Sequence, residues 1–229
     1  MDLPITHHGS RISNEVNQRA MPDLIIEDAT PGLRKGDLDP NPFIQFGKWY
    51  AEALNADLIL PNAMALATAA RSGIPSARMV LLKEFDDRGF VFYTNYESRK
   101  SRELEENPVA ALLFYWASLD RQIRITGTIK RVSHAESEAY FRTRPLDSRL
   151  GAWASDQSAV IADRTVLEDR MKALAAEYDN KEIPLPRNWG GYRLAPDGFE
   201  FWQSRPSRLH DRLSYRVVDD EWIIERLAP

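Results

Sequence analysis

Short apolar segments separated by tight turn signals fill the middle of this sequence. The runs 64–69, 77–83 and 90–94 are divided at 71–73 and 86–89, where Gly, Ser, Asp and Arg gather. Connections this short can join antiparallel strands, whereas parallel strands need a crossover of a dozen or more residues. The chain is therefore predicted to fold mainly into antiparallel β-structure, most simply a barrel with a few flanking helices.

The remaining strand signals differ in which faces they predict to be buried. The run 109–116 is apolar throughout and predicts a strand buried on both faces, whereas 122–129 alternates polar with apolar residues and predicts one wet face. Further strands are predicted at 191–194, 199–203, 212–217 and 221–226.

Helical periodicity marks four stretches. The first is predicted to begin at Pro42, because Phe43, Phe46, Tyr50 and Leu54 follow that first-turn proline at helical spacing. The others are a helix-like stretch at 98–106 that an Asn-Pro pair stops, a helix from a Ser133/Glu136 capping box to about Arg144, and an apolar stripe over 167–178.

The first forty residues differ from the rest of the chain. Residues 1–40 are polar, contain prolines and show no periodicity, which predicts a mobile arm that orders only against a partner or ligand. Residues 41–229 are then predicted to form one domain, because compact domains commonly contain roughly 100 to 200 residues.

Composition excludes several function classes. The chain of 229 residues has no cysteine, which excludes disulfides, thiolate metal sites and cysteine nucleophiles and favours a reducing, cytoplasmic location. Its formal net charge of -4 provides no basic field for nucleic acid, and no apolar run approaches a membrane span. No metal site is predicted, since two of the four histidines lie in the arm. The sequence motifs of dinucleotide-binding Rossmann enzymes, P-loop NTPases, α/β-hydrolases and zincins are missing.

Cationic residues beside the predicted strands are the remaining chemical signal. Arg78 and Lys83 bracket one strand at an odd separation, so they face opposite sides unless one bends round the strand end. Arg99 and Lys100 begin a helix, where backbone N–H groups favour an anion, although a solvated helix start has the same appearance.

A second group surrounds the capping-box helix and the strand before it. Tyr140 and Arg144 are four residues apart and project from one face of the helix, and Ser148 lies one loop beyond. These three residues form either a phosphate clamp or an exposed arginine that stacks on a tyrosine. The polar face that contains Gln122 either lines a ligand groove or is the solvent-facing side of a sheet.

The segment 200–212 contains the densest cluster. Trp202 ends an aromatic strand, and Arg208, His210 and Arg212 point to one side if the segment is extended. Like charges on one face repel, so either an anion binds there or nearby carboxylates such as Asp211 satisfy them.

Taken together, these motifs resemble the pyridoxine (pyridoxamine) 5′-phosphate oxidase family. The resemblance covers about residues 40–229 and rests on many blocks in the family's order. They are RMVLLK (78–83), VFYTNYESRKSREL (91–104), NPVAALLFYW (107–116), RQIRITG (121–127), YFRTRPLDSRLGAWASDQS (140–158), WGGYRL (189–194), EFWQSRPSRLHDR (200–212) and the terminal ERLAP.

The resemblance implies a split β-barrel with flanking helices and a homodimer with FMN at the subunit interface. By family pattern, the phosphate of the substrate would contact Lys83, Tyr140, Arg144 and Ser148, and the catalytic pair Arg208 and His210 would sit over its pyridine ring. FMN would be bound by Arg78, Met79, Val80, Leu81, Leu82, Lys83, Tyr93, Thr94, Arg99, Lys100, Gln122, Gln157, Ser158, Trp202 and Arg212.

The implied activity is oxidation of pyridoxine and pyridoxamine 5′-phosphates to pyridoxal 5′-phosphate. Hydride would pass from C4′ of the substrate to FMN, and O₂ would reoxidise the flavin and give H₂O₂.

The sequence departs from the family pattern at one place. Residues 25–28 are Ile-Ile-Glu-Asp, where family members often have an Arg and a Tyr that help close over the substrate. Two alternatives are a paralogous FMN oxidase of a phenazine-type pathway and a split-barrel module that binds flavin or haem without turnover.

Overall fold

The computed structural model describes residues 32–229, and all strand pairings in this part are antiparallel. One nine-stranded sheet runs in the order β2-β1-β5-β6-β7-β4-β3, with β8 on β7 and β9 on β8. The strands are β1 (Ala63–Ala69), β2 (Pro75–Leu81), β3 (Glu84–Asp86), β4 (Gly89–Asn95), β5 (Val109–Trp116), β6 (Arg121–Arg131), β7 (Trp189–Gln203), β8 (Asp211–Val218) and β9 (Glu221–Leu227).

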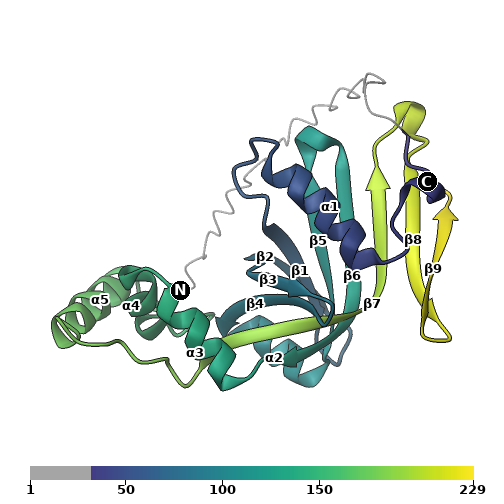
Figure 1. Cartoon of the computed structure of the whole chain (residues 1–229). Coiled ribbons are helices and arrows are strands. Elements are labelled where there is room, and N and C mark those ends of the chain that lie inside the picture. Colours follow the sequence, from purple (N-terminus) through teal and green to yellow (C-terminus); the bar gives the residue numbers. More distant parts are fainter. Residues whose placement is uncertain (1–31) are drawn as a thin grey trace, which may run out of the picture.

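Within residues 32–229, five α-helices flank this sheet, so the predicted mainly β class with flanking helices is confirmed (Figure 1). In Figure 1, α1 lies against the sheet, while α3, α4 and α5 gather at the lower left. The helices are α1 (Pro42–Leu54), α2 (Arg99–Glu106), α3 (His134–Thr143), α4 (Leu146–Ala154) and α5 (Thr165–Glu177), with short 3₁₀ turns η1 (Lys35–Asp37), η2 (Ala117–Leu119) and η3 (Pro206–Arg208).

Strand β7 organises the sheet, because its two halves have different neighbours. Residues 189–194 pair with β4 and residues 198–203 pair with β8, while β6 runs along most of its length. The two strands predicted at 191–194 and 199–203 are therefore one continuous strand. The β6–β7 register shifts at Gly127, where a Cβ atom would lie 2.1 Å from the Ala195 carbonyl oxygen, so only glycine fits.

The main core lies between α1 and the inner face of the sheet. The Phe46 ring packs edge-on against Phe85 and Phe90, each with centroids 4.8 Å apart. Asn41 caps α1 by accepting a hydrogen bond from the Phe43 N–H, and Pro42 occupies the first turn as predicted. Leu54, the last residue of the predicted apolar stripe, is 56% exposed, because the buried face runs through Trp49 and Ala53.

The prediction that β5 is buried on both faces is wrong for the single chain. Alternate residues such as Leu112 and Phe114 are buried in the core, whereas Val109 is 49% and Tyr115 is 62% exposed on the outer face. An apolar strand with an exposed face indicates a surface that another molecule can cover.

The helices beyond β6 form a smaller unit around the start of β7. The predicted capping box is present, since the Ser133 hydroxyl accepts from the Glu136 N–H and the Glu136 carboxylate accepts from the Ser133 N–H. Helix α4 was not predicted as a helix. It buries Leu150 against Trp189 and carries Ser148.

The predicted arm differs from the structure over its last nine residues. Residues 32–40 pack on the sheet rather than extending away from it: Leu38 is buried, the Tyr215 hydroxyl donates to the Asp39 carbonyl, and Asp211 accepts from the Leu33 N–H. Residues 1–31, including the departure at 25–28, lie outside the described residues.

Within residues 32–229, no helix combines the length and apolarity needed to cross a membrane. The cytoplasmic location stays a prediction.

Candidate functional site

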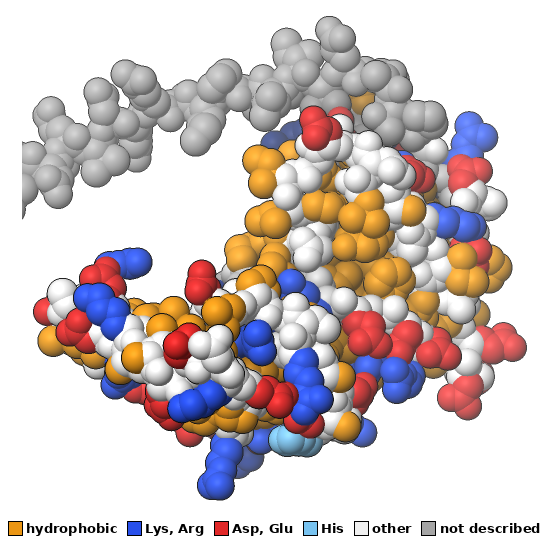
Figure 2. All heavy atoms as spheres, turned by 60° about the vertical axis from the view of Figure 1, so that its left-hand side comes forward, with side chains coloured by type: hydrophobic (Ala, Val, Ile, Leu, Met, Phe, Trp, Pro, Cys, Tyr) orange, Lys and Arg blue, Asp and Glu red, His pale blue; other side chains and the backbone are white. Residues whose placement is uncertain are grey.

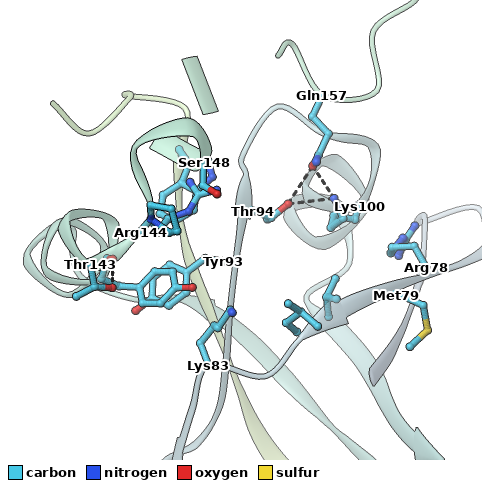
Figure 3. A pocket seen from close by; sticks show the side chains of 15 residues that line it. Arg78, Met79, Lys83, Tyr93, Thr94, Lys100, Thr143, Arg144, Ser148 and Gln157 are labelled. Atoms are coloured by element: carbon cyan, nitrogen blue, oxygen red, sulfur yellow. Dashed lines mark hydrogen bonds between the residues drawn. The ribbon is translucent and has the colours of Figure 1, made fainter. Parts of the chain in front are cut away.

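A pocket of about 560 Å³ opens between the strands β2 and β4 and the helices α3 and α4 (Figure 3). Most of the predicted ligand-binding residues line it. They are Arg78, Met79, Val80, Leu81, Lys83, Tyr93, Thr94, Lys100, Tyr140, Arg144, Ser148 and Gln157, joined by Thr143, Pro145 and Trp189. Figure 2 shows a hollow between the helical part and the sheet, with basic side chains beside it.

Arg78 and Lys83 both line this pocket although they are separated by an odd number of positions. Strand β2 ends at Leu81, so Lys83 lies beyond the strand and escapes its alternation. Of the two arrangements that the spacing allowed, the chain adopts the one in which a cation bends round the strand end.

Lys100 is a buried ammonium group on one side of the pocket. Its Nζ donates to Gln157 Oε1 at 2.7 Å, to Thr94 Oγ1 at 3.0 Å and to Ser98 Oγ at 3.3 Å. Burial, followed by the charge of Arg78, lowers the pKa of Lys100 to about 8. Within residues 32–229 these hydrogen-bond acceptors are neutral, so none of them neutralises the positive charge of Lys100.

Arg78, next to Lys100, is held by a buried carboxylate that the sequence did not point to. Glu103 of α2 is 6% exposed, and its Oε2 lies 3.1 Å from Arg78 Nη2. Burial by itself would raise the pKa of Glu103, but hydrogen bonds from Ser76, Thr68, Arg99 and Arg78 lower it to about 2. The carboxylate is therefore ionised at neutral pH.

The opposite side of the pocket is built on stacked aromatic rings. Tyr93 stacks on Tyr140 with centroids 4.0 Å apart and on Trp189 at 5.5 Å. The Arg144 guanidinium lies 4.6 Å from the Trp189 ring centroid, and Lys83 Nζ lies 5.9 Å from that of Tyr140. Burial raises the pKa of Tyr93 to about 12, so its hydroxyl stays protonated.

Arg144 has a buried donor for which the described residues provide no acceptor. Its Nη1 is buried and, among residues 32–229, has no hydrogen-bond partner, and burial lowers its pKa. A buried guanidinium donor without an acceptor is costly unless a ligand accepts from it. The alternative of an exposed arginine stacked on Tyr140 is therefore wrong, because the guanidinium has a buried Nη1 and packs over Trp189, and the phosphate clamp stays a prediction. Arg144 lies one residue beyond the end of α3, and its guanidinium packs over Trp189.

Five predicted ligand-binding residues lie well outside this pocket, four of them near the C-terminus. They are Gln122, Trp202, Arg208, His210 and Arg212, and Gln122 on β6 pairs with Trp202 on β7. The segment before β8 is turned, because Ser207 and Arg208 have φ values of 57° and 60°. The segment is therefore not extended, and the condition under which Arg208, His210 and Arg212 would point to one side is not met.

This C-terminal cluster has its own internal order. The His210 ring lies 4.7 Å from Trp202, and its Nδ1 accepts from the Arg205 N–H at 3.1 Å. Burial, together with Arg208, lowers the pKa of His210, which favours the neutral ring with its proton on Nε2. Arg212 donates to Glu200 at 2.8 Å, so it is satisfied by a carboxylate on β7.

Three other predicted residues border the pocket without lining it. Leu82 is buried in the main core. The Arg99 side chain donates to Glu103, and its backbone N–H donates to Ser158 Oγ at 3.2 Å. Arg99 and Ser158 therefore lie at the start of α2, next to Lys100.

Comparison with known proteins identifies the family. The sequence model described as pyridoxamine 5′-phosphate oxidase matches residues 50–177, and that described as the pyridoxine 5′-phosphate oxidase C-terminal dimerisation region matches residues 189–229. The chain belongs to the pyridoxine/pyridoxamine 5′-phosphate oxidase family. The resemblance seen in its motifs is thereby confirmed.

Curated members of this oxidase family match almost the whole chain. A pyridoxine/pyridoxamine 5′-phosphate oxidase of Nostoc sp. is 56% identical over 212 residues, which is 92% of this chain and 99% of the relative. One of Burkholderia mallei is 56% identical over 210 residues, covering 90% and 98% of the two chains.

Solved structures confirm the split-barrel fold of the oxidase family. PhzG from Burkholderia lata, determined with tetrahydrophenazine-1-carboxylic acid, superposes with a TM-score of 0.81 at 34% identity and covers 85% of this chain and 95% of its own. A pyridoxamine 5′-phosphate oxidase-related, FMN-binding protein from Nostoc punctiforme gives 0.64 at 20% identity, covering 80% and 96%, and shows the shared fold alone.

Proposed function

We propose that this protein is an FMN-dependent oxidase that converts pyridoxine and pyridoxamine 5′-phosphates to pyridoxal 5′-phosphate, with O₂ as electron acceptor and H₂O₂ as product. The observation that carries the proposal is a single pocket with cations on two sides. Arg78 and Lys100 lie on one side and Arg144 on the other, as Figure 3 shows. Such an arrangement suits a phosphorylated cofactor beside a phosphorylated substrate.

The residues on the Lys100 side fit the phosphate of FMN. Lys100 would provide a charge-assisted donor, because its hydrogen-bond partners are neutral, and Thr94 and Gln157 add polar contacts. Arg78 adds a fixed positive charge, since its Nη groups already donate to protein oxygens. When bound, FMN supplies the redox chemistry, taking two electrons from the substrate and passing them to O₂. The protein contributes binding, orientation and electrostatics.

The residues on the Arg144 side fit the phosphate of the substrate. The unpartnered Arg144 donor, Lys83, Tyr140 and Ser148 would bind the dianion, and the tyrosine stack would form a wall of the pocket. Fixing the phosphate orients the rest of the substrate, which is the main way such a site lowers the barrier.

The C-terminal cluster would complete the pocket of a second copy. Arg208 and His210 are absent from the pocket of their own chain, and they lie in the region that matches the family's dimerisation region. The chain also exposes apolar residues on β2 and β5, with Met79 63% and Tyr115 62% exposed. A homodimer with FMN at its interface covers this surface and places a guanidinium and a neutral imidazole Nε2–H over the substrate ring.

Binding of FMN is expected to weaken as the pH rises through about 8, the pKa of Lys100. A bound dianion favours the ammonium form, so the dissociation constant increases once Lys100 loses its proton in the flavin-free protein. Between about pH 7 and about pH 9 the increase should approach tenfold. Flavin fluorescence titration measures it, and Lys100→Arg should remove the dependence; an unchanged pH profile in that variant would contradict this role.

Anaerobic reduction tests the activity itself. The FMN-loaded protein is mixed with pyridoxine 5′-phosphate without oxygen, and the visible band of oxidised flavin is followed. We expect the band to bleach and to return on admission of air, with pyridoxal 5′-phosphate formed. If flavin binds but stays oxidised, the phenazine-type oxidase or a non-catalytic flavin module replaces this proposal, and tetrahydrophenazine-1-carboxylic acid is the next substrate to try.

A further inference from the structure

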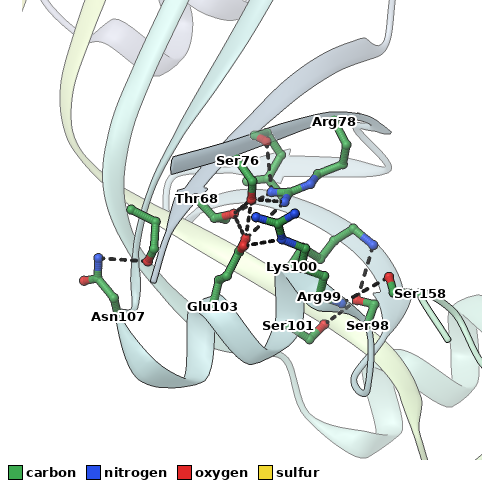
Figure 4. Close-up of polar contacts among 12 residues, drawn as sticks. Thr68, Ser76, Arg78, Ser98, Arg99, Lys100, Ser101, Glu103, Asn107 and Ser158 are labelled. Atoms are coloured by element: carbon green, nitrogen blue, oxygen red, sulfur yellow. Dashed lines mark hydrogen bonds and ion pairs between the residues drawn. The ribbon is translucent and has the colours of Figure 1, made fainter. Parts of the chain in front are cut away.

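A carboxylate lies within the cation cluster on the Lys100 side of the pocket (Figure 4). Glu103 projects from α2 onto the β1–β2 hairpin, where Thr68 and Ser76 are paired. Its side chain is 8% exposed, whereas that of Arg78 is 21% and that of Arg99 is 59% exposed. The acid therefore lies behind the two guanidinium groups, away from solvent.

The two carboxylate oxygens have separate tasks. Oε2 accepts from Arg78 Nη2 at 3.1 Å and from the hydroxyls of Thr68 and Ser76, each at 2.5 Å. Oε1 accepts from Arg99 Nε at 2.9 Å. One group thus fixes one arginine from a strand and one from a helix, a pattern that depends on the ionised form because every neighbour is a donor.

The same network also fixes the Arg78 guanidinium through bonds to groups other than Glu103. Nη1 donates to the Leu66 carbonyl at 3.2 Å and to Thr68 Oγ1 at 2.5 Å, while Nη2 also donates to the Ser76 hydroxyl. A free arginine loses considerable rotamer freedom when it binds a phosphate. Here most of that freedom is already lost in the folded protein.

We propose that Glu103 is a positioning residue of the cofactor-phosphate site: its carboxylate presets Arg78 and Arg99 so that they can bind the phosphate of FMN. The inference rests on the proposed function, since it assumes that FMN occupies this side of the pocket. It reverses the expectation from charge alone, because a buried anion beside an anion site should weaken phosphate binding.

The sign of one substitution separates the two effects. Glu103→Gln keeps the size of the side chain and removes its negative charge, so simple electrostatics predicts tighter FMN binding. Positioning predicts the opposite, because the amide offers only one accepting oxygen and turns an N–H group toward arginine donors. Glu103 is ionised in the wild type throughout the useful pH range, so its protonation does not confuse the comparison.

The experiment titrates flavin-free full-length protein with FMN and with riboflavin, which lacks the phosphate. For Glu103→Gln we expect the dissociation constant of FMN to rise about tenfold or more and that of riboflavin to change less than about twofold. The matched control is Glu106→Gln, an exposed acid on the same helix, which should affect neither flavin. Unchanged or tighter FMN binding, or equal losses for both flavins, would overturn the inference.

A second variant tests the same inference if Glu103→Gln does not fold. Ser76→Ala leaves the carboxylate in place but removes one hydrogen bond to Glu103 and one acceptor of Arg78. It should weaken FMN binding about two- to fivefold, again without changing riboflavin binding. If the wild type shows no preference for FMN over riboflavin, the proposed site itself is wrong; if that preference exists and survives in both variants, only the role of Glu103 is wrong.

Discussion

Replacing Arg208 with alanine is expected to lower kcat/KM for pyridoxine 5′-phosphate at least about a hundredfold, while the affinity for FMN changes less than about threefold. The reason is location: Arg208 lies outside the pocket that would bind the cofactor phosphate and is proposed to reach the substrate in the pocket of the second copy. Its loss removes a charged contact to the substrate without disturbing Arg78 or Lys100. Steady-state kinetics and flavin titration on the same preparation give both quantities.

Arg216, on the strand β8 that follows Arg208, provides a matched control. Arg216 pairs with Glu225 on the exposed faces of β8 and β9, so Arg216→Ala should leave kcat/KM within about twofold of wild type. Wild-type turnover by Arg208→Ala would refute the assignment of this residue. Loss of FMN together with activity would instead place Arg208 in the cofactor site.

Two inactive variants are expected to restore activity when they share a dimer. Arg144→Ala should raise KM for the phosphorylated substrate at least about a hundredfold, because it removes the buried, unpartnered donor. In a dimer of one Arg144→Ala chain and one Arg208→Ala chain, one pocket has both defects and the other has neither. An equal mixture that exchanges subunits freely should therefore recover roughly a quarter of the wild-type rate.

The control for this mixture uses two defects in the same pocket. Lys83 and Arg144 both line one pocket of one chain, so a mixture of Lys83→Ala and Arg144→Ala leaves no intact site and should recover nothing. Recovery in both mixtures would point to reversal of misfolding rather than to shared sites. No recovery with Arg208→Ala, despite proven subunit exchange, would refute the composite pocket.

The sequence predicted most helices and strands, because each is encoded by residues close together in the chain. The α3 capping box, the α1 proline and the alternation of 122–129 are decided by neighbours in the sequence, and the structure contains each of them. The burial of 109–116 was misjudged because its exposed face is as apolar as its core face. Periodicity does not distinguish a core from a surface that a second molecule covers.

The parts of the site that sequence reasoning missed depend on contacts between distant segments. Glu103 looks like any acid on a helix until β1 and β2 place Thr68 and Arg78 against it. The turn at Ser207 and Arg208 has positive φ values at both residues. Serine and arginine rarely adopt positive φ, so the sequence does not predict this turn. The family pattern supplied the members of the pocket, but it did not show that Arg208 and His210 lie outside the pocket of their own chain.

Strand β7 has a consequence for how the sequence of this enzyme can change. Its first residue, Trp189, forms a wall of one pocket, while Trp202 near its other end belongs to the cluster proposed to serve the pocket of the partner. Adding or deleting one residue between them would turn every later side chain to the opposite face. Length variation among descendants of this chain should therefore be confined to loops, and the spacing between the two tryptophans should be inherited as a unit.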